Sequence, residues 1–310
     1  MIISFGAIYM SLDMRVKKFP ENGQIVHTPS YEMTPSGKAA NQALAAVRAG
    51  AKTALVGRVG DDGNGLRILQ NLKRHGVMTS GVAKCTEYLT GMASVFHDEL
   101  GRTRKIIAQA ANNLISADLA PSDIFNANNI LMVQMEVPLE QNAVVMKTAK
   151  DKGAKVVLNL SPSSPIPLPM LRLCDYLILN EIQILKFAKA MQLDANKDIQ
   201  SVMRDIAYKA RVTVVTYNQD GSAVLIGEDA KGLVLKPKRD FTITDIAGVT
   251  DVFCGTFTAC IHEKKTLAVA LKMAGCAYML AAQKEGIQNS FPFSEDVNEA
   301  MKDFGDVTPI

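Results

Sequence analysis

Asp251 lies where a short glycine-containing loop meets the start of a predicted helix, a position suited to phosphate chemistry. The loop and helix start read TDIAGVTDVFCG over Thr244–Gly255, and the apolar run 252–261 after it is typical of a helix. The first N–H groups of a helix lack intrahelical partners and carry partial positive charge, so such a place binds anions, phosphate above all. An aspartate there can take the proton of a hydroxyl that attacks the phosphorus. The alternative is that Asp251 only caps the helix.

A second stretch that could carry chemistry reads SGKAANQA and covers Ser36–Ala43. Gly37 lets the backbone approach a small ligand closely. Lys38 and Asn41, three positions apart, can point to one side and bind hydroxyls. On its own, the pattern also fits a helix start made of small residues.

Together the two stretches resemble the two signatures of the ribokinase-like sugar kinases, the PfkB family. The later stretch is similar to D-T-T-G-A-G-D-A-F-x-G and matches it at Asp245, Gly248, Asp251, Phe253 and Gly255. It departs from that signature at Ile246, Ala247, Val249, Thr250 and Val252. The earlier stretch is similar to G-G-K-G-A-N-Q-A, with Ser36 and Ala39 in place of glycines.

The resemblance implies ATP-dependent phosphorylation of a primary hydroxyl on a sugar or a nucleoside, with Mg²⁺ bridging the phosphates. It makes Asp251 the general base. The backbone N–H groups of Gly248 to Asp251, those of Val249 and Thr250 included, become the anion hole. If position 250 needs a glycine-only backbone conformation, its threonine costs on the order of 1–3 kcal/mol.

The expected acceptor site begins with the earlier signature. By resemblance, Gly37, Lys38 and Asn41 contact the sugar. Glu136 follows a predicted strand in a Q-x-E-x-P pattern, whose glutamate lies near the sugar in the family. These residues predict a polar cradle and a ligand rich in hydroxyls.

The N-terminal segment departs from the family in a way that bears on the acceptor. The family's opening G-S-x-N-x-D corresponds to residues 6–11, so Ser11 stands where an aspartate usually binds sugar hydroxyls. Asp13 lies two residues further, on the same strand face by period-two alternation. Tyr9 replaces the asparagine and offers an aromatic face, which favours a nucleoside or a substituted sugar over free ribose.

The nucleotide and metal positions are expected from resemblance alone. Asn180 and Gln183 fall where the family has N-x-x-E, whose residues help to hold Mg²⁺ largely through water, and Gln183 replaces the glutamate. Asn180, at a strand-to-helix junction, is also typical of a helix cap. Asp245 corresponds to a residue that helps to hold a monovalent cation, K⁺, in many relatives. The expected nucleotide contacts are Asn180, Thr216, Asn218, Gly221 and Gly275.

Two alternative functions stay open. Departures at four positions favour a non-catalytic relative that binds a sugar or nucleotide as a sensor or partner: Ser11, Gln183, Thr250 and Gly275. The run Gly57–Gly65 suggests a dinucleotide-dependent oxidoreductase, but its spacing is G-x-x-G-x-x-G-x-G and an acidic pair lies where pyrophosphate would bind. A similar G-R-V-G-D-D run in the kinase family is a structural loop.

The composition is that of an ordinary soluble protein. The 310 residues are 48% hydrophobic and 21% charged, with a net charge of +3 and no dense basic cluster, which argues against a nucleic-acid surface. The five cysteines show no C-x-x-C pair, which predicts reduced thiols and a cytoplasmic protein. The apolar start lacks the features of a signal peptide, and no apolar run is long enough to span a membrane.

The predicted elements alternate between strands and helices, which favours one α/β domain over 1–310 with a mostly parallel sheet and helices on both faces. Two segments that do not alternate, about 9–35 and 84–108, are candidates for a small β lid, through which the chain can form a homodimer. The expected strands are 1–7, 53–59, 92–96, 104–108, 130–135, 155–160, 176–179, 212–216, 222–234 and 239–243. The expected helices are 41–49, 66–74, 140–152, 181–191, 197–210, 266–284 and 294–302.

Overall fold

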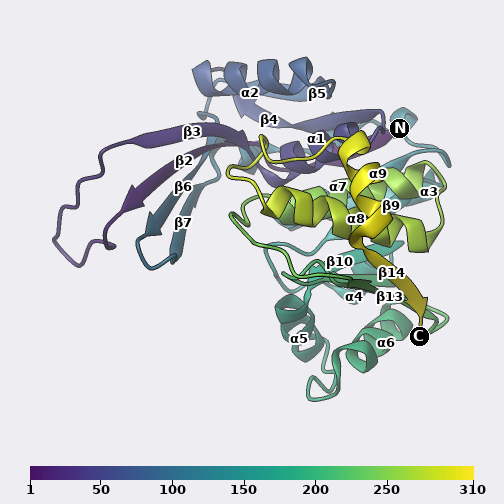
Figure 1. The fold of residues 1–310 in the computed structure, drawn as a ribbon. Coiled ribbons are helices and arrows are strands. Elements are labelled where there is room, and N and C mark those ends of the chain that lie inside the picture. Colours follow the sequence, from purple (N-terminus) through teal and green to yellow (C-terminus); the bar gives the residue numbers. More distant parts are fainter.

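A ten-stranded sheet forms the centre of the computed structural model, which describes residues 1–310 (Figure 1). Its order is β14-β13-β12-β11-β10-β9-β8-β1-β4-β5, parallel from β5 to β11 and antiparallel from β11 to β14. The strands are β1 (Ile2–Phe5), β4 (Thr53–Gly60), β5 (Met78–Cys85), β8 (Ile130–Gln134), β9 (Lys155–Asn159), β10 (Tyr176–Asn180), β11 (Thr213–Tyr217), β12 (Ala223–Ile226), β13 (Gly232–Pro237) and β14 (Gly305–Pro309).

Helices cover both faces of this sheet, which is why central strands such as β8 and β9 carry buried apolar residues on both faces rather than alternating. Neighbouring residues of β9 show the division: Val157 belongs to one core cluster, while Val156 and Leu158 belong to the other. The first cluster packs against α1 (Lys38–Arg48), α2 (Gly63–Arg74), α7 (Val249–His262), α8 (Leu267–Ala282) and α9 (Ser294–Phe304). The second packs against α3 (Leu139–Asp151), α4 (Leu168–Leu171), α5 (Glu181–Ala190) and α6 (Ile199–Ala210). Figure 1 shows α7 and α8 on one side of the sheet and α5 and α6 on the other.

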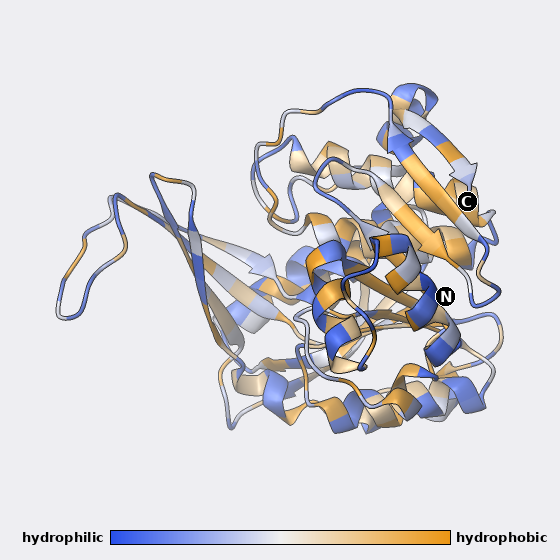
Figure 2. Ribbon diagram, turned by 90° about the horizontal axis from the view of Figure 1, so that it is seen from below, coloured by the Kyte–Doolittle hydropathy of each residue, from blue (hydrophilic) through white to orange (hydrophobic).

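A separate four-stranded sheet projects from the body as a lid (Figures 1 and 2). Its order is β3-β2-β6-β7, with β2 and β6 parallel at its centre. Its strands are β2 (Tyr9–Val16), β3 (Tyr31–Ser36), β6 (Gly91–Asp98) and β7 (Thr103–Ala108). Residues 84 and 85, which the sequence placed with the lid, belong instead to β5 of the central sheet.

Other elements differ from the sequence expectation at the edges of the fold. The segment 239–243 is not a strand; the polypeptide runs there as a loop after β13. The edge strands β5 and β14 were not expected, since β14 is mostly exposed and lacks a regular apolar pattern. Three short 3₁₀ helices lead from the lid back to β8: η1 (Ala110–Leu114), η2 (Ala117–Leu119) and η3 (Ser122–Ile124).

The thiols and the helix lengths agree with the composition. All five cysteines are unpaired and buried. None of the helices combines the length and the apolar character that crossing a membrane would require.

Candidate active site

Asp251 lies in the first turn of α7, after a glycine that shapes the turn. Gly248 has a φ of 76°, in the left-handed region, and a Cβ built there would come within 2.8 Å of Ile287 Cγ2. The N–H groups of Asp251 and Val252 donate to the Gly248 carbonyl, whereas those of Val249 and Thr250 find no acceptor within the chain. The helix start therefore presents unpaired donors, as an anion site requires.

The Asp251 carboxylate turns away from its own helix and toward α1. Its Oδ2 accepts a hydrogen bond of 2.9 Å from Asn41 Nδ2, and its Oδ1 accepts one of 3.0 Å from Gln42 Nε2. The Lys38 ammonium lies 4.0 Å from Oδ1. No backbone N–H of α7 donates to the carboxylate, so Asp251 lies in the first turn without forming a capping hydrogen bond.

Thr250 fits the helix without strain. It lies inside the first turn of α7 and is absent from the non-glycine residues with positive φ, so the expected cost of a glycine-only conformation does not arise. Its Oγ1 and the Tyr217 hydroxyl form a hydrogen bond of 3.1 Å, which ties the helix start to the end of β11. The departure from the signature at this position is therefore accommodated.

Lys38 and Glu136 are charged residues that lie beside Asp251. The Lys38 backbone N–H donates to Glu136 Oε2 over 3.3 Å. Burial lowers the pKa of Lys38, but the Asp251 and Glu136 carboxylates outweigh that effect and hold its pKa above the ordinary value. Burial also raises the pKa of Glu136, and Lys38 offsets this only in part. Gly37, with a φ of 102°, passes so close to Ile8 and Tyr9 that a Cβ would lie 2.6–2.8 Å from their backbone and that of Ala7.

On the lid, Ser11 and Asp13 form a pair facing the central domain. Ser11 Oγ donates to Asp13 Oδ2 over 2.5 Å, as their common strand face allows. His97 Nε2 lies 3.5 Å from Asp13 Oδ1. Arg15, next on the same face, lies 3.4 Å from Glu285 in the loop after α8, which identifies this face as the one turned toward the body.

Tyr9 does not offer the aromatic face that the sequence suggested. Its side chain is 2% exposed, and its hydroxyl donates to Gln109 Oε1 over 2.5 Å. Its ring lies so close to Gly91 that a Cβ there would come within 2.6 Å of Cδ1. Tyr9 is thus a packing residue at the base of the lid, because that base is too crowded for a ligand ring.

The expected nucleotide residues lie along the carboxyl ends of β10 and β11. Asn180 and Gln183 form a reciprocal capping box, each accepting the other's backbone N–H over 2.9 Å. Asn218 Nδ2 donates to Glu181 Oε1 over 2.9 Å, and Thr216 is fully buried with an unpartnered hydroxyl. The capping alternative for Asn180 is therefore correct as far as its local bonds go.

The two expected nucleotide glycines serve close packing. Gly221 has a φ of 79°, and a Cβ there would lie 2.4 Å from Met279 Cγ. A Cβ on Gly275 would lie 2.4 Å from Leu235 Cδ2 and 2.9 Å from the Gly221 carbonyl oxygen. Gly275 thus lets α8 approach the turn between β11 and β12.

Comparison with known proteins decides the family. The model of the pfkB family carbohydrate kinases matches residues 1–294. The chain belongs to this family. It is 28% identical over 304 residues to a ribokinase of Schizosaccharomyces pombe, covering 94% of each chain. It is 25% identical over 304 residues to a deoxyribokinase of Salmonella typhi, covering 97% of this chain and 98% of that one.

The fold agrees with that of a solved relative. The structure of Arabidopsis thaliana ribokinase complexed with ribose and ATP superimposes with a TM-score of 0.87 at 24% identity, covering 97% of this chain and 98% of that one. The predicted ribokinase-like kinase family and its α/β fold are confirmed.

Membership of the pfkB kinases removes the oxidoreductase alternative, and the geometry of the Gly57–Gly65 run explains why. Asp62 caps α2 by accepting from Gly65 N over 2.8 Å, and it also binds Thr90. A Cβ on Gly60 would lie 2.4 Å from Thr90 N. Asp62 and Gly60 are thus engaged with the segment that leads to β6, which agrees with the expected structural loop.

The metal positions of this pfkB kinase fit their ions only in part. No group of three or more His, Cys, Asp or Glu side chains could hold a metal ion. Mg²⁺ would therefore depend on nucleotide oxygens and water, which suits an ion that loses its water reluctantly. Asp245 Oδ1 already accepts from Ala247 N over 2.9 Å and Oδ2 from Gly286 N over 3.1 Å, so a K⁺ ion would share that carboxylate.

Sequence reasoning missed the amides that surround the kinase's Asp251. Gln42 lies within the earlier signature and Gln288 lies in the segment after α8, but no role was assigned to either. Their side chains are 0% and 6% exposed. A buried amide inside a signature is itself a signal, because such a group needs hydrogen-bond partners.

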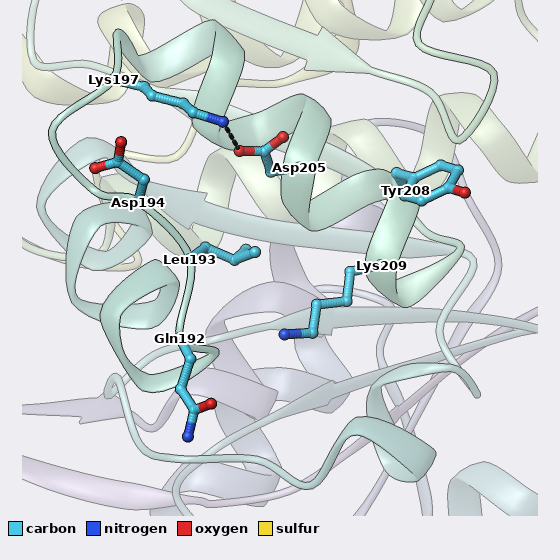
Figure 3. Close-up of a pocket in the computed structure, with 7 residues that line it drawn as sticks. All are labelled: Gln192, Leu193, Asp194, Lys197, Asp205, Tyr208 and Lys209. Atoms are coloured by element: carbon cyan, nitrogen blue, oxygen red, sulfur yellow. Dashed lines mark hydrogen bonds and ion pairs between the residues drawn. The ribbon is translucent and has the colours of Figure 1, made fainter.

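One surface hollow lies apart from this site. It is lined by Gln192, Leu193, Asp194, Lys197, Asp205, Tyr208 and Lys209, and it has a volume of about 370 Å³ (Figure 3). The hollow lies on α6 and on the loop between α5 and α6, and these two helices cover the face of the sheet opposite to α7. Lys197 and Asp205 pair with each other there over 2.7 Å, and Lys209 Nζ donates to the Met191 carbonyl oxygen over 2.6 Å, so both lysines are engaged within the chain.

Proposed function

We propose that the chain is an ATP-dependent kinase that transfers a phosphoryl group to a primary hydroxyl of a sugar or a nucleoside. The observation that carries the proposal is the position of the Asp251 carboxylate. Asp251 lies in the same first turn of α7 as the unpaired N–H groups of Val249 and Thr250, and its carboxylate is held by Asn41 and Gln42. A proton acceptor beside an anion site is what in-line attack on a phosphate requires.

The residues of the chain have different roles in the proposed phosphoryl transfer. Asp251 accepts the proton of the attacking hydroxyl. Gly37, Lys38, Asn41 and Glu136 hold the other hydroxyls of the acceptor. The N–H groups of Gly248, Val249 and Thr250 bind the transferring phosphoryl oxygens, whereas that of Asp251 is used within the helix. Closure of the lid excludes water, which otherwise competes as acceptor.

ATP is proposed to bind at the carboxyl ends of β10 and β11. Thr216 supports this placement, since its buried hydroxyl has no partner and lies at the end of β11. Asn218, Gly221 and Gly275 then shape the site through packing rather than through direct contact. The solved complex of Arabidopsis thaliana ribokinase with ribose and ATP supports ATP as the donor.

Two ions accompany this proposal. Asn180 and Gln183 would hold Mg²⁺ through water, and the ion would supply positive charge to the phosphates of ATP. Asp245 would hold K⁺, whose charge would stabilise the loop before Gly248. Their binding depends on the nucleotide and the loop carbonyls because the side chains alone form no closed ligand set.

The acceptor is proposed to be a pentose or a molecule that contains one. The Ser11–Asp13 pair restores a carboxylate on the lid face, two residues further along β2 than the family position. The names of relatives, ribokinase and deoxyribokinase, support a pentose. The displaced carboxylate suits a larger acceptor such as a nucleoside, which is the second candidate within the same activity.

A homodimer through the lid is proposed because the outer face of the lid carries several apolar side chains that are at least partly exposed. Cross-strand register places these apolar side chains on that face: Leu12, Met14, Tyr31, Met33, Phe96 and Ile106, of which Met33 also packs against the body. Tyr31 is 66% exposed and Ile106 is 68% exposed. Sedimentation should show a dimer for the wild type and a monomer for Ile106→Glu; a monomeric wild type would refute the assembly. A cytoplasmic location is proposed on the basis of the five unpaired thiols.

The experiment that tests the function is a coupled assay of ADP release with Mg-ATP and a panel of acceptors: D-ribose, 2-deoxy-D-ribose, and purine and pyrimidine nucleosides. We expect turnover with at least one acceptor, and its loss in Asp251→Asn. Acceptor binding without turnover, seen as a raised melting temperature, would support the non-catalytic sensor instead.

A further inference from the structure

Two chains of side-chain amides end on the two oxygens of the Asp251 carboxylate. In the first, Asn71 Nδ2 donates to Gln288 Oε1 over 2.8 Å, and Gln288 Nε2 donates to Asn41 Oδ1 over 3.0 Å. Asn41 Nδ2 then donates to Asp251 Oδ2 over 2.9 Å.

The second chain is shorter and arrives from the central sheet. Gln134 Nε2, at the end of β8, donates to Gln42 Oε1 over 2.9 Å. Gln42 Nε2 then donates to Asp251 Oδ1 over 3.0 Å. The chains thus begin on different elements, α2 and β8, and approach the carboxylate from two directions.

The direction of every bond follows from the carboxylate. An ionised carboxylate can only accept, so Asn41 and Gln42 must present their NH₂ groups to it. Their carbonyl oxygens then point away, and each requires a donor because it is buried. Gln288 and Gln134 are those donors, which means that each outer amide fixes which end of the inner amide faces Asp251.

We propose that Gln42 and Gln288, supported by Gln134 and Asn71, are positioning residues that hold the Asp251 carboxylate in a single orientation toward the acceptor hydroxyl. The inference rests on the proposed function of Asp251 as the base. Donors to a carboxylate favour its charged form, which is the form that can take a proton. Amide donors on both oxygens also prevent the carboxylate from rotating.

Few charged groups lie close enough to Asp251 to compete with the amides or to take their place. Lys38 on α1 is the cation nearest to Asp251, with 4.0 Å between Lys38 Nζ and Oδ1. Glu136, after β8, adds a like charge, and Cys254 on α7 and Tyr217 on β11 are the other titratable groups that face the carboxylate. Burial raises the pKa of both Cys254 and Tyr217, so they stay neutral and leave the amides as the direct hydrogen-bond donors to the carboxylate.

The first test follows the Asn41 side-chain amide protons by NMR during acid titration of the unliganded protein. These signals must move when Asp251 takes up a proton. Gln42→Leu should shift the transition upward by about one to two pH units, since a hydrogen bond to a charged group is lost. Gln288→Leu should shift the transition upward by less, because Gln288 bonds to Asn41 and not to Asp251 itself.

The matched control is Thr258→Val, a near-isosteric change in α7, the helix that also carries Asp251. The Thr258 hydroxyl donates only to the Cys254 carbonyl. It should leave the transition in place. If Gln42→Leu does not fold, Gln134→Leu interrupts the same chain one link further out. Transitions at the same pH in the glutamine variants, the control and the wild type would overturn the proposal, since the amides would then serve packing alone.

The second test uses kcat with the best acceptor of the panel described above. Gln42→Leu should lower kcat and move the acidic limb of its pH dependence upward, with little change in the KM for ATP. If Asp251→Asn keeps full turnover, the proposed function fails. If Asp251→Asn is inactive while both glutamine variants keep the wild-type kcat and pH limb, only the positioning role fails.

Discussion

The Asn41 amide and the Asp251 carboxylate are 210 positions apart in the sequence, yet they form a hydrogen bond of 2.9 Å. This bond joins the two signature stretches, one at the start of α1 and the other at the start of α7. Asn41 was expected to contact the acceptor. With Nδ2 bonded to Asp251 and Oδ1 bonded to Gln288, it keeps only one N–H and one lone pair for a ligand. The proposed acceptor site and the proposed base are thus parts of one network.

Gly248→Ala should disturb both the fold and the anion site. The left-handed φ of 76° and the 2.8 Å approach to Ile287 predict a loss of about 1–3 kcal/mol in the free energy of unfolding, together with a lower kcat. Gly63→Ala is the matched control because its φ is not in the left-handed region and no atom lies within 4 Å of its Cβ position. Urea unfolding of the two variants checks the prediction, and equal stabilities would contradict it.

Glu136→Gln should remove a pH dependence from acceptor binding. Burial raises the pKa of Glu136 above 4.5, so its carboxylate becomes protonated earlier than usual as the pH falls. The wild-type KM for the acceptor should therefore rise as the pH is lowered toward 4.5, through that raised pKa, and should be lowest above it. The variant should have a higher KM that is flat over the same range. A parallel rise in both proteins would mean that another group titrates.

Gln183→Glu should add a charge without harming the helix. A glutamate at this capping-box position can still accept from Asn180 N, so the stability should be unchanged within about 0.5 kcal/mol. If water links this position to Mg²⁺, the concentration of Mg²⁺ at half-maximal activity should fall. An unchanged Mg²⁺ titration with intact folding would place the ion elsewhere.

The sequence predicted the fold well for strands that are buried on both faces of the sheet. The strands 130–135 and 155–160 were mostly apolar, and the observed β8 and β9 differ from them by only a residue. The edge strand β14 was missed because an edge lies half in solvent and needs no apolar pattern. The segment 239–243 alternates like a strand but has no neighbouring strand to pair with.

The types of the site residues could be predicted from the sequence, but their hydrogen-bond partners and packing neighbours could not. Asp251, Lys38 and Glu136 were identified from their sequence context, and the fold brings them together. Tyr9 was misjudged because sequence alone does not reveal that its ring is buried beside Gly91. Gln42 and Gln288 were missed because their role depends on a contact between segments that are distant in the sequence.

The most direct test of the central claim is the rate of phosphoryl transfer by Asp251→Asn, measured with Mg-ATP and the best acceptor. An asparagine keeps the volume of the side chain but cannot act as a base. We predict a loss of about 10²–10⁴-fold in kcat, with the affinity for ATP nearly intact. A variant that turns over the acceptor at close to the wild-type rate would contradict the claim that Asp251 is the base.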